Sequence, residues 1–253
     1  MELKIISFNI RCCDDENGNS IAERAPRLNE VISHYDADLI GFQEYTPQWE
    51  KPVMEYFGKD FEIFNKYRAE SQKESAPILW RKDKFECLKK GYFWLSDTLE
   101  VESRGYDGVY NCFRICEYAV LREKQSNKTF TFMNTHFGFG DNGQSKSVNL
   151  IYEYSKKISS YPTFIVGDFN MTPDDVAYSA MCEKFTDVNA VTANDLRTTY
   201  HGYNPEGIKR TEHIDFCFTD GNIKPVSQKI IDDTVDGMFP SDHYGIYVKI
   251  ELQ

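Results

Sequence analysis

Apolar and polar positions follow one another along this chain in the patterns of both strands and helices. Residues 3–10, with the sequence LKIISFNI, predict a buried strand. Apolar residues then recur at helical spacing, which predicts an amphipathic helix over residues 22–35. A second strand is expected over residues 38–44. The chain therefore begins with a strand–helix–strand unit.

The rest of the chain continues this mixture. Residues 47–57 and the region around 148–158 predict helices, and Pro173 is expected to open a short helix at its first turn. Residues 96–113 are expected to form a long loop rich in charge, Gly and Tyr. Further strands are predicted over residues 61–66, 77–81, 85–95, 115–122, 129–136, 163–167, 213–218 and 244–252.

The order of these elements indicates a fold class. Hairpins occupy the middle of the chain, and strand–helix alternation lies on either side of them. This order predicts an α/β (α+β) fold with two packed mixed sheets flanked by helices, rather than one doubly wound parallel sheet.

Length and charge narrow the picture further. The chain has 253 residues, of which 41% are hydrophobic, and no repeat or linker divides it, so we expect a single domain over residues 1–253. The net charge is −11, and Lys and Arg form no run. Because duplex binding depends on phosphate contacts from a basic face, strong duplex DNA binding is not expected. The acidic balance suits a site that recruits divalent cations.

The cysteines and the hydropathy of the chain indicate the cellular compartment of the protein. The seven cysteines form no Cys-x-x-Cys pair, which argues against a zinc ribbon and favours reduced thiols in a cytoplasmic protein. No apolar leader or membrane-spanning stretch is visible, so we expect no membrane contact, with a removed export signal as the open alternative. A monomer is expected.

Six predicted strand ends finish in polar groups. Asp168 and Asn170 are two positions apart, so they share one side of the chain while Phe169 packs away. Each residue alone has an ordinary explanation, such as a turn hydrogen bond, a solvated strand end or a cap. The set is therefore more informative than any member: Asn9, Glu44, His136, Asp168 with Asn170, Asp215, and Asp242 with His243.

Together these residue types match the needs of phosphoester hydrolysis. That reaction uses a hard cation on oxygen ligands, a positioned water, a base, and donors for the charge on phosphorus. Glu44 and Asp242 could hold the cation. His243 could act as the base, oriented by Asp215. The other polar strand ends could place the water and bind the transferring oxygens: Asn9, His136, Asp168 and Asn170.

In these segments the chain resembles the endonuclease/exonuclease/phosphatase superfamily, whose members are deoxyribonuclease I-like. The resemblance implies a four-layer α/β/β/α sandwich with the site at one end of the two sheets, and Mg²⁺ or Mn²⁺ as cofactor. Softer matches at residues 74–81, 93–96 and 113–116 are similar to a bacterial subgroup of uncharacterised hydrolases. The principal matches are Ser7-Phe8-Asn9, Gly41-Phe42-Gln43-Glu44, Asn134-Thr135-His136, Gly167-Asp168-Phe169-Asn170, Ile214-Asp215-Phe216 and Ser241-Asp242-His243.

The resemblance also implies a role for each matched residue. Asp215 and His243 correspond to the catalytic dyad, and His136 to a histidine that contacts the scissile phosphate. Asp168 and Asn170 correspond to the pair that positions water and stabilises the transition state. The matched metal positions are Glu44, Asn9 and Asp242.

Several residues near these motifs keep open alternatives. Arg114 could bind a substrate phosphate bidentately or form an ion pair with Glu117 or Glu74. Glu74 could also orient His136. His213 stands where many relatives carry Arg, and the roles of His213 and His201 stay open.

The sequence therefore predicts a divalent-metal-dependent phosphoester hydrolase, a phosphodiesterase or phosphatase in which a water activated by His243 and Asp215 attacks in line. The expected substrate is a phosphorylated small molecule or a single-stranded nucleic acid. The alternative within the superfamily is a nuclease, foremost a 3′–5′ exoribonuclease like the deadenylases. A binding protein that kept the fold without catalysis is the alternative from another class. Tyrosines in the loops at 96–113 and 194–211 could stack on a base or sugar: Tyr106, Tyr110, Tyr200 and Tyr203.

Overall fold

The computed structural model describes residues 1–208 and 211–253, and contains two six-stranded mixed sheets packed face to face. Positions 209 and 210, part of the predicted loop 194–211, lie outside the described residues. The first sheet has the order β11-β12-β1-β2-β4-β3. Its strands are β1 (Glu2–Asn9), β2 (Leu39–Gln43), β3 (Phe61–Phe64), β4 (Ile78–Arg81), β11 (Ile223–Ile231) and β12 (Gly245–Leu252).

The second sheet has the order β5-β6-β7-β8-β10-β9. Each sheet contains one parallel pair, β1 with β2 and β7 with β8, and antiparallel neighbours elsewhere. A parallel pair needs a crossover connection. The strands of this sheet are β5 (Phe85–Trp94), β6 (Ile115–Glu123), β7 (Thr129–His136), β8 (Thr163–Asp168), β9 (Thr186–Asp187) and β10 (Asp215–Thr219).

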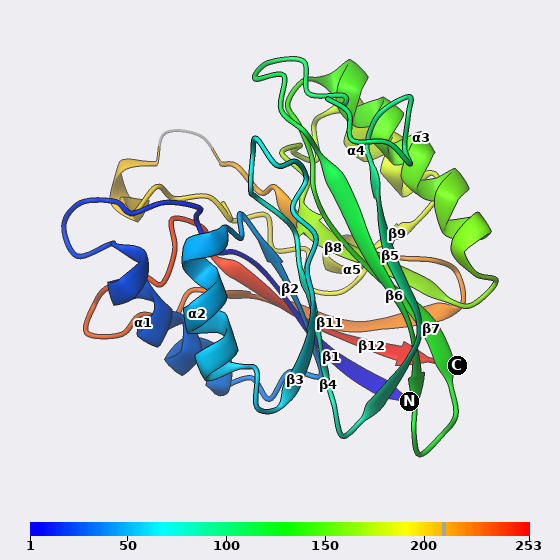
Figure 1. Cartoon of the computed structure of the whole chain (residues 1–253), viewed down its shortest axis with the longest axis horizontal. Coiled ribbons are helices and arrows are strands. Elements are labelled where there is room, and N and C mark those ends of the chain that lie inside the picture. The colour runs from blue at the N-terminus through cyan, green and yellow to red at the C-terminus, as the bar shows by residue number, and fades with distance from the viewer. Residues whose placement is uncertain (209–210) are drawn as a thin grey trace.

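Helices cover the outer faces of the two sheets (Figure 1). Crossover helix α1 (Ile21–Ser33) joins β1 to β2 and packs with α2 (Pro47–Tyr56) on the first sheet. Crossover helix α3 (Asp141–Ile158) joins β7 to β8 and packs with α4 (Val176–Cys182) on the second sheet. The short α5 (Val188–Val191) follows β9, and a single 3₁₀ turn spans Pro205–Gly207. The predicted four-layer α/β/β/α arrangement is confirmed.

Local sequence accounts for these elements. A capping box formed by Ser20 and Glu23 starts α1, whose apolar stripe then faces the sheet. The space between the sheets is filled by side chains from both, including Leu3, Phe132 and Val166. In the described part of the chain, no helix combines the length and apolar character needed to cross a bilayer.

Three predictions about elements need correction. Strand β11 was not predicted, and α3 begins at Asp141 rather than near position 148. The helix expected to open at Pro173 begins at Val176 instead. The reason is local: the Asp175 carboxylate accepts the Thr172 N–H at 2.6 Å, which closes a turn around Pro173 before the helix begins.

Candidate active site

The topology brings the polar strand ends to one edge of the sandwich. Parallel strands β1 and β2 end together, with Asn9 opposite Gln43. Parallel strands β7 and β8 also end together, with His136 opposite Asp168. Antiparallel β10 begins beside that point, because Asp215 pairs with Asp168. Residues far apart in sequence therefore meet around one location.

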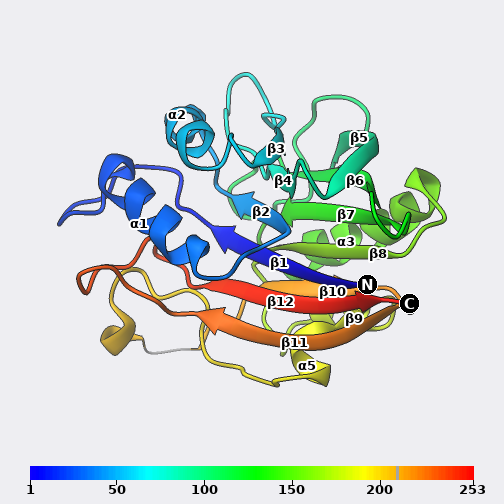
Figure 2. The ribbon, with the colours of Figure 1, turned by 90° about the horizontal axis from the view of Figure 1, so that it is seen from below.

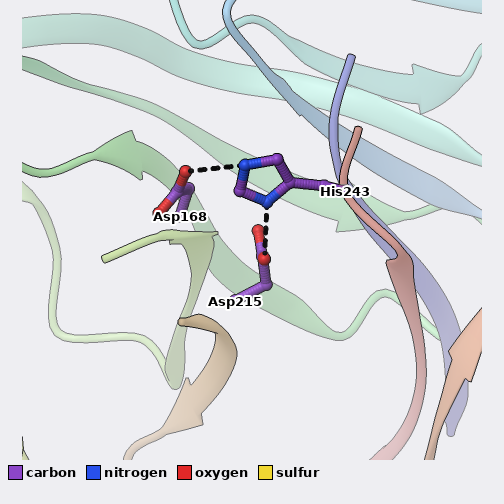
Figure 3. A group of neighbouring side chains, drawn as sticks. All are labelled: Asp168, Asp215 and His243. Carbon is purple, nitrogen blue, oxygen red and sulfur yellow. Dashed lines mark hydrogen bonds and ion pairs between the residues drawn. The ribbon is translucent and has the colours of Figure 1, made fainter. Parts of the chain in front are cut away.

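His243 lies between two carboxylates (Figure 3). Its Nδ1 is 3.0 Å from Oδ2 of Asp215, and its Nε2 is 3.8 Å from Oδ2 of Asp168. The dyad is buried, and the ring of Tyr200 packs edge-on against His243 with centroids 5.1 Å apart. One ring nitrogen is thus held by Asp215, while the other faces the residue that should position a water.

The surroundings of His243 favour its charged form. Burial alone would lower the pKa of His243, but the charge and hydrogen bond of Asp215, with the charges of Asp168 and Asp242, raise it to about 10. Burial also raises the pKa of Asp215. The rise in the pKa of His243 has the clearer cause, because three carboxylates surround this one imidazole.

Glu44 is the best-placed ligand for a cation. It follows β2 with a φ of +60°, in the left-handed region that residues with a Cβ seldom adopt. Its Oε1 accepts the Asn9 side-chain N–H at 3.2 Å, and its Oε2 accepts the Cys12 backbone N–H at 2.8 Å. Burial alone would raise the pKa of Glu44, but the charges of His136 and His243 and these hydrogen bonds lower it to about 2.

Asp168 Oδ2 links the two sheets within the site. Asn9 Nδ2 donates to it at 2.9 Å, and His136 Nε2 lies 3.5 Å from it. The other oxygen, Oδ1, accepts the backbone N–H of Asn170 at 3.0 Å. Asn170 itself has a φ of +48° and donates through Nδ2 to the carbonyl of Phe137 at 2.9 Å.

On the Nδ1 side of His136, the charged residues Glu74 and Arg68 line the cavity. Glu74 Oε1 lies 3.6 Å from His136 Nδ1, the place expected for a residue that orients this ring. Glu74 is also held bidentately by Arg68 at 2.6 and 2.8 Å. Arg68 and Glu74 thus fix one another before any substrate arrives.

Arg114 has a partner that the sequence did not predict. Its Nε and Nη2 lie 3.4 and 3.3 Å from Oδ2 of Asp107. Glu74 pairs with Arg68 instead, and Glu117 accepts the Lys66 backbone N–H at 3.1 Å. The expected ion pair of Arg114 with Glu117 or Glu74 is therefore wrong in its partner, because the loop 96–113 folds back to bring Asp107 to the start of β6.

A cavity of about 620 Å³ joins these groups. Asn9 and Asp215 are absent from its lining among the described residues, but both hydrogen-bond to residues that line it. The lining also includes groups that the sequence did not single out: Arg11, Cys12, Arg68, Gln72 and Cys112. The predicted residues that line it are Glu44, His136, Asp168, Asn170, Asp242, His243 and Arg114, with Tyr110 and Tyr200 from the loops.

The two histidines whose roles the sequence left open, His201 and His213, are packing residues. His201 is buried with its ring 4.2 Å from that of Tyr244, centroid to centroid. His213 is buried beside Phe216, and its Nδ1 bonds the carbonyl of Arg197 at 2.8 Å. Arg11 was missed although it follows Asn9 by two positions, because its partners are set by the fold. No periodic signal marks it, because Arg11 and its partner Asp15 lie in a loop rather than in a helix.

The donor set fits a hard divalent cation. Glu44, Asp168 and Asp242 are carboxylates facing one cavity, the last two buried and Glu44 half-buried, and Glu44 is bonded by neutral N–H groups that leave its charge unbalanced. Asp168, Asp215 and His243 also offer ligand atoms within 4.8 Å of one another. In that trio, however, Asp215 already occupies His243 Nδ1, so the trio is better suited to moving a proton.

Comparisons with known proteins find the same fold in solved structures. A solved endonuclease/exonuclease/phosphatase family protein from Bacteroides thetaiotaomicron superposes with a TM-score of 0.91 at 25% identity, covering 100% of this chain and 98% of that one. A mannosyl-6-phosphatase from the same species superposes with a TM-score of 0.87 at 26% identity, covering 99% of each chain.

One protein with a similar sequence is a nuclease. The CCR4-Not complex 3′-5′-exoribonuclease subunit Ccr4 of Debaryomyces hansenii is 25% identical over 190 residues, which cover 61% of this chain and 23% of that protein. The chain spans 23% to 35% of the length of the curated relatives it matches. The model of the Endonuclease/Exonuclease/phosphatase family matches residues 6–243, and the chain belongs to this family.

Proposed function

We propose that this protein is a divalent-metal-dependent phosphoester hydrolase. The observation that carries the proposal is the meeting of the His243–Asp215 pair with Glu44 and Asp168 around one cavity. An imidazole held by a carboxylate can take a proton, and a carboxylate with neutral partners can hold a cation. Family membership supports the same chemistry, because family relatives include a phosphatase and a nuclease.

Glu44 would be the principal residue holding the cation, with Asp242 and the side-chain oxygen of Asn9 as further candidates. That oxygen already accepts the Arg11 N–H at 3.1 Å, but a carbonyl oxygen has a second lone pair. When bound, Mg²⁺ or Mn²⁺ would polarise a phosphoryl oxygen and offset negative charge on it.

Side chains of the protein would transfer the proton, orient the water and bind the phosphoryl oxygens. In its neutral form, which a cation at Glu44 would favour by offsetting the nearby carboxylate charges, His243 accepts a proton from water at Nε2, while Asp215 holds the Nδ1 proton and stabilises the imidazolium that forms. Asp168 accepts a hydrogen bond from the same water and orients it for in-line attack. His136 and Asn170, which line the cavity, donate hydrogen bonds to the phosphoryl oxygens.

The cavity favours a small phosphorylated substrate. Its volume lies in the range of ordinary small-molecule sites, and its walls carry carboxylates that would repel an extended polyanion. Arg114 Nη1 is buried and makes no hydrogen bond to any described residue, so it is available to a phosphate oxygen that approaches. Similarity to a mannosyl-6-phosphatase supports a phosphatase acting on such a molecule. We also propose that the protein is a cytoplasmic monomer. The observation that supports the cytoplasmic location is that all seven cysteines are free thiols.

A 3′–5′ exoribonuclease is the second candidate. Tyr110 and Tyr200 line the cavity and are exposed, so each could stack on a base. Similarity to an exoribonuclease subunit supports this reading. Tyr106 and Tyr203 contribute nothing to the lining that the described residues form, so only two of the four predicted tyrosines could stack there.

A substrate panel tests the proposal. We would assay sugar phosphates, nucleoside monophosphates, phosphodiesters, inositol phosphates and short RNAs, each with Mg²⁺ and with EDTA. We expect metal-dependent release of phosphate from a small monoester, and a loss of about 100-fold or more in His243→Ala. His34→Ala, which changes an exposed histidine at the end of α1, is the matched control. Hydrolysis that is unaffected by EDTA, or by His243→Ala, would overturn the proposal.

A further inference from the structure

Arg11 places a permanent positive charge beside the carboxylate of Asp242. Its Nε lies 3.7 Å from Oδ2 of Asp242, and its side chain is 32% exposed where it lines the cavity. Asp15 clamps the same guanidinium, with Nε to Oδ2 at 2.9 Å and Nη2 to Oδ1 at 3.1 Å. Because an arginine side chain keeps its proton in proteins, this charge is present at every working pH.

The backbone directs Arg11 to this position. Its φ is +62°, a left-handed conformation that costs free energy for a residue with a Cβ. Three contacts hold that conformation: the Arg11 N–H donates to Asn9 Oδ1 at 3.1 Å, and its carbonyl accepts Trp49 Nε1 at 2.9 Å and Arg24 Nη2 at 3.3 Å. Backbone strain that is held in place by surrounding contacts is typical of functional sites.

Glu44 and Asp242, the two carboxylates that could hold a cation, differ in the groups that hydrogen-bond to them or face them. Glu44 receives hydrogen bonds from the neutral donors of Asn9 and Cys12. Asp242 receives a hydrogen bond from Ser241 Oγ at 3.3 Å, and its other oxygen faces the Arg11 guanidinium. Glu44 therefore keeps its full charge for a cation, whereas the charge of Asp242 is partly balanced within the protein.

We propose that Arg11 limits this centre to one divalent cation, bound at Glu44, and that its guanidinium takes the place of a second cation beside Asp242. The inference rests on the proposed function, because it assumes a divalent cation at Glu44. A second divalent ion on Asp242 would stand next to a fixed positive charge, and like charges repel strongly at such distances in a partly buried site.

Counting bound ions tests this inference without measuring turnover. Mn²⁺ is titrated into the whole protein, and free Mn²⁺ is followed by its electron paramagnetic resonance signal. We expect one bound Mn²⁺ in the wild type and in Arg11→Lys, which keeps the charge. We expect two in Arg11→Met, and a return to one in the double variant Arg11→Met with Asp242→Asn.

Arg197→Met is the matched control. Arg197 bridges two carboxylates, Asp195 and Asp232, each at 2.9 Å, and it is absent from the cavity lining that the described residues form. Its removal should leave the count at one, and thermal melting checks that each variant is folded.

The outcomes separate the two proposals. Two bound ions in the wild type or in Arg11→Lys, or a single ion in folded Arg11→Met, would overturn the role of Arg11 while metal-dependent hydrolysis could still stand. If Arg11→Met does not fold, the counts in the wild type and Arg11→Lys decide. A wild-type protein that binds no Mn²⁺ at all would overturn both the inference and the proposed function.

Discussion

His243 owes its properties to the carboxylates on either side of its ring. Asp215 holds Nδ1 at 3.0 Å, and Asp168 lies 3.8 Å from Nε2. The pKa of about 10 lies above the ordinary histidine value of 6.5, so the charged form is favoured in the folded state. By linkage, the stability that this ion pair contributes is fully present below pH 6.5 and is lost as the pH rises through about 10.

Replacing Asp215 should reverse this shift. In Asp215→Asn the carboxylate charge is gone while burial remains, so the pKa of His243 should fall by about 1–3 units. Imidazole proton signals in an NMR titration with EDTA present would report the value directly. Asp187→Asn removes a buried carboxylate on β9 and should leave the His243 pKa unchanged. An unaltered pKa in Asp215→Asn would contradict the assigned dyad.

Arg114 should contribute to substrate binding. Arg114→Lys keeps the charge but removes the planar fork, so KM should rise by about tenfold, equivalent to about 1.4 kcal/mol, with a smaller change in kcat. Steady-state kinetics on the best monoester would measure both constants. Arg104→Lys, on the same loop and stacked on Phe113, is the control and should leave KM unchanged. An unchanged KM in Arg114→Lys would leave Arg114 as a structural partner of Asp107.

Much of the candidate site was predictable because its residues stand in short motifs at strand ends. Glu44 and His243 could be named because each ends or precedes a strongly apolar run. Arg11 and the Asp107 partner of Arg114 could not, because a pair of charges is set by loop conformation and leaves no periodic signal. The sequence also gives no measure of distance, so the 3.8 Å between His243 and Asp168 had to come from the structure.

At the scale of elements, the two sheets must approach closely for the site to form. Gln43 on β2 donates to Ser7 on the neighbouring β1 at 3.0 Å and to Asn134 on β7 at 2.7 Å, and the second of these bonds joins the two sheets. A Cβ on Gly41 would lie 2.7 Å from Val166 and 2.8 Å from Asn134. The distance between the sheets is therefore set by a glycine and an amide pair.

Gly41→Ala should push the sheets apart. The overpacking should cost about 1–3 kcal/mol of unfolding free energy, because the nearest atoms belong to buried side chains of the opposite sheet. Urea denaturation followed by circular dichroism would measure this loss. Gly221→Ala, where an added Cβ meets nothing within 4 Å, should be close to neutral. Equal stability of the two variants would contradict the close approach.

The elements themselves were predictable where their pattern was long and apolar. Strands β7 and β12 were placed to within one residue, because β7 is buried along nearly its whole length and β12 alternates regularly between buried and half-buried positions. Strand β11 was missed because Pro225 and two lysines, Lys224 and Lys229, interrupt its apolar pattern. Its pairing with β12, which includes a bulge between Pro225 and Ser227, supplies the stability that its own sequence does not indicate.

At the scale of the whole molecule, the net charge of −11 limits what the protein can bind. Binding to a 20-base-pair duplex at physiological salt should be weaker than about 10⁻⁴ M, the weak end of ordinary non-specific affinity. Fluorescence anisotropy with a labelled duplex, with and without Mg²⁺, would measure it. Affinity tighter than about 10⁻⁵ M would show that a local basic surface outweighs the overall charge.

The place of β12 in the first sheet has a consequence for biosynthesis. Figure 2 shows this strand, the last in the chain, between β1, the first, and β11. Strand β11 therefore cannot join the rest of the first sheet until β12 has been translated and has left the ribosome, and His243 arrives just before that strand. The candidate site thus cannot be complete before β12 is in place, and loss of Gly245–Leu252 would separate β1 from β11.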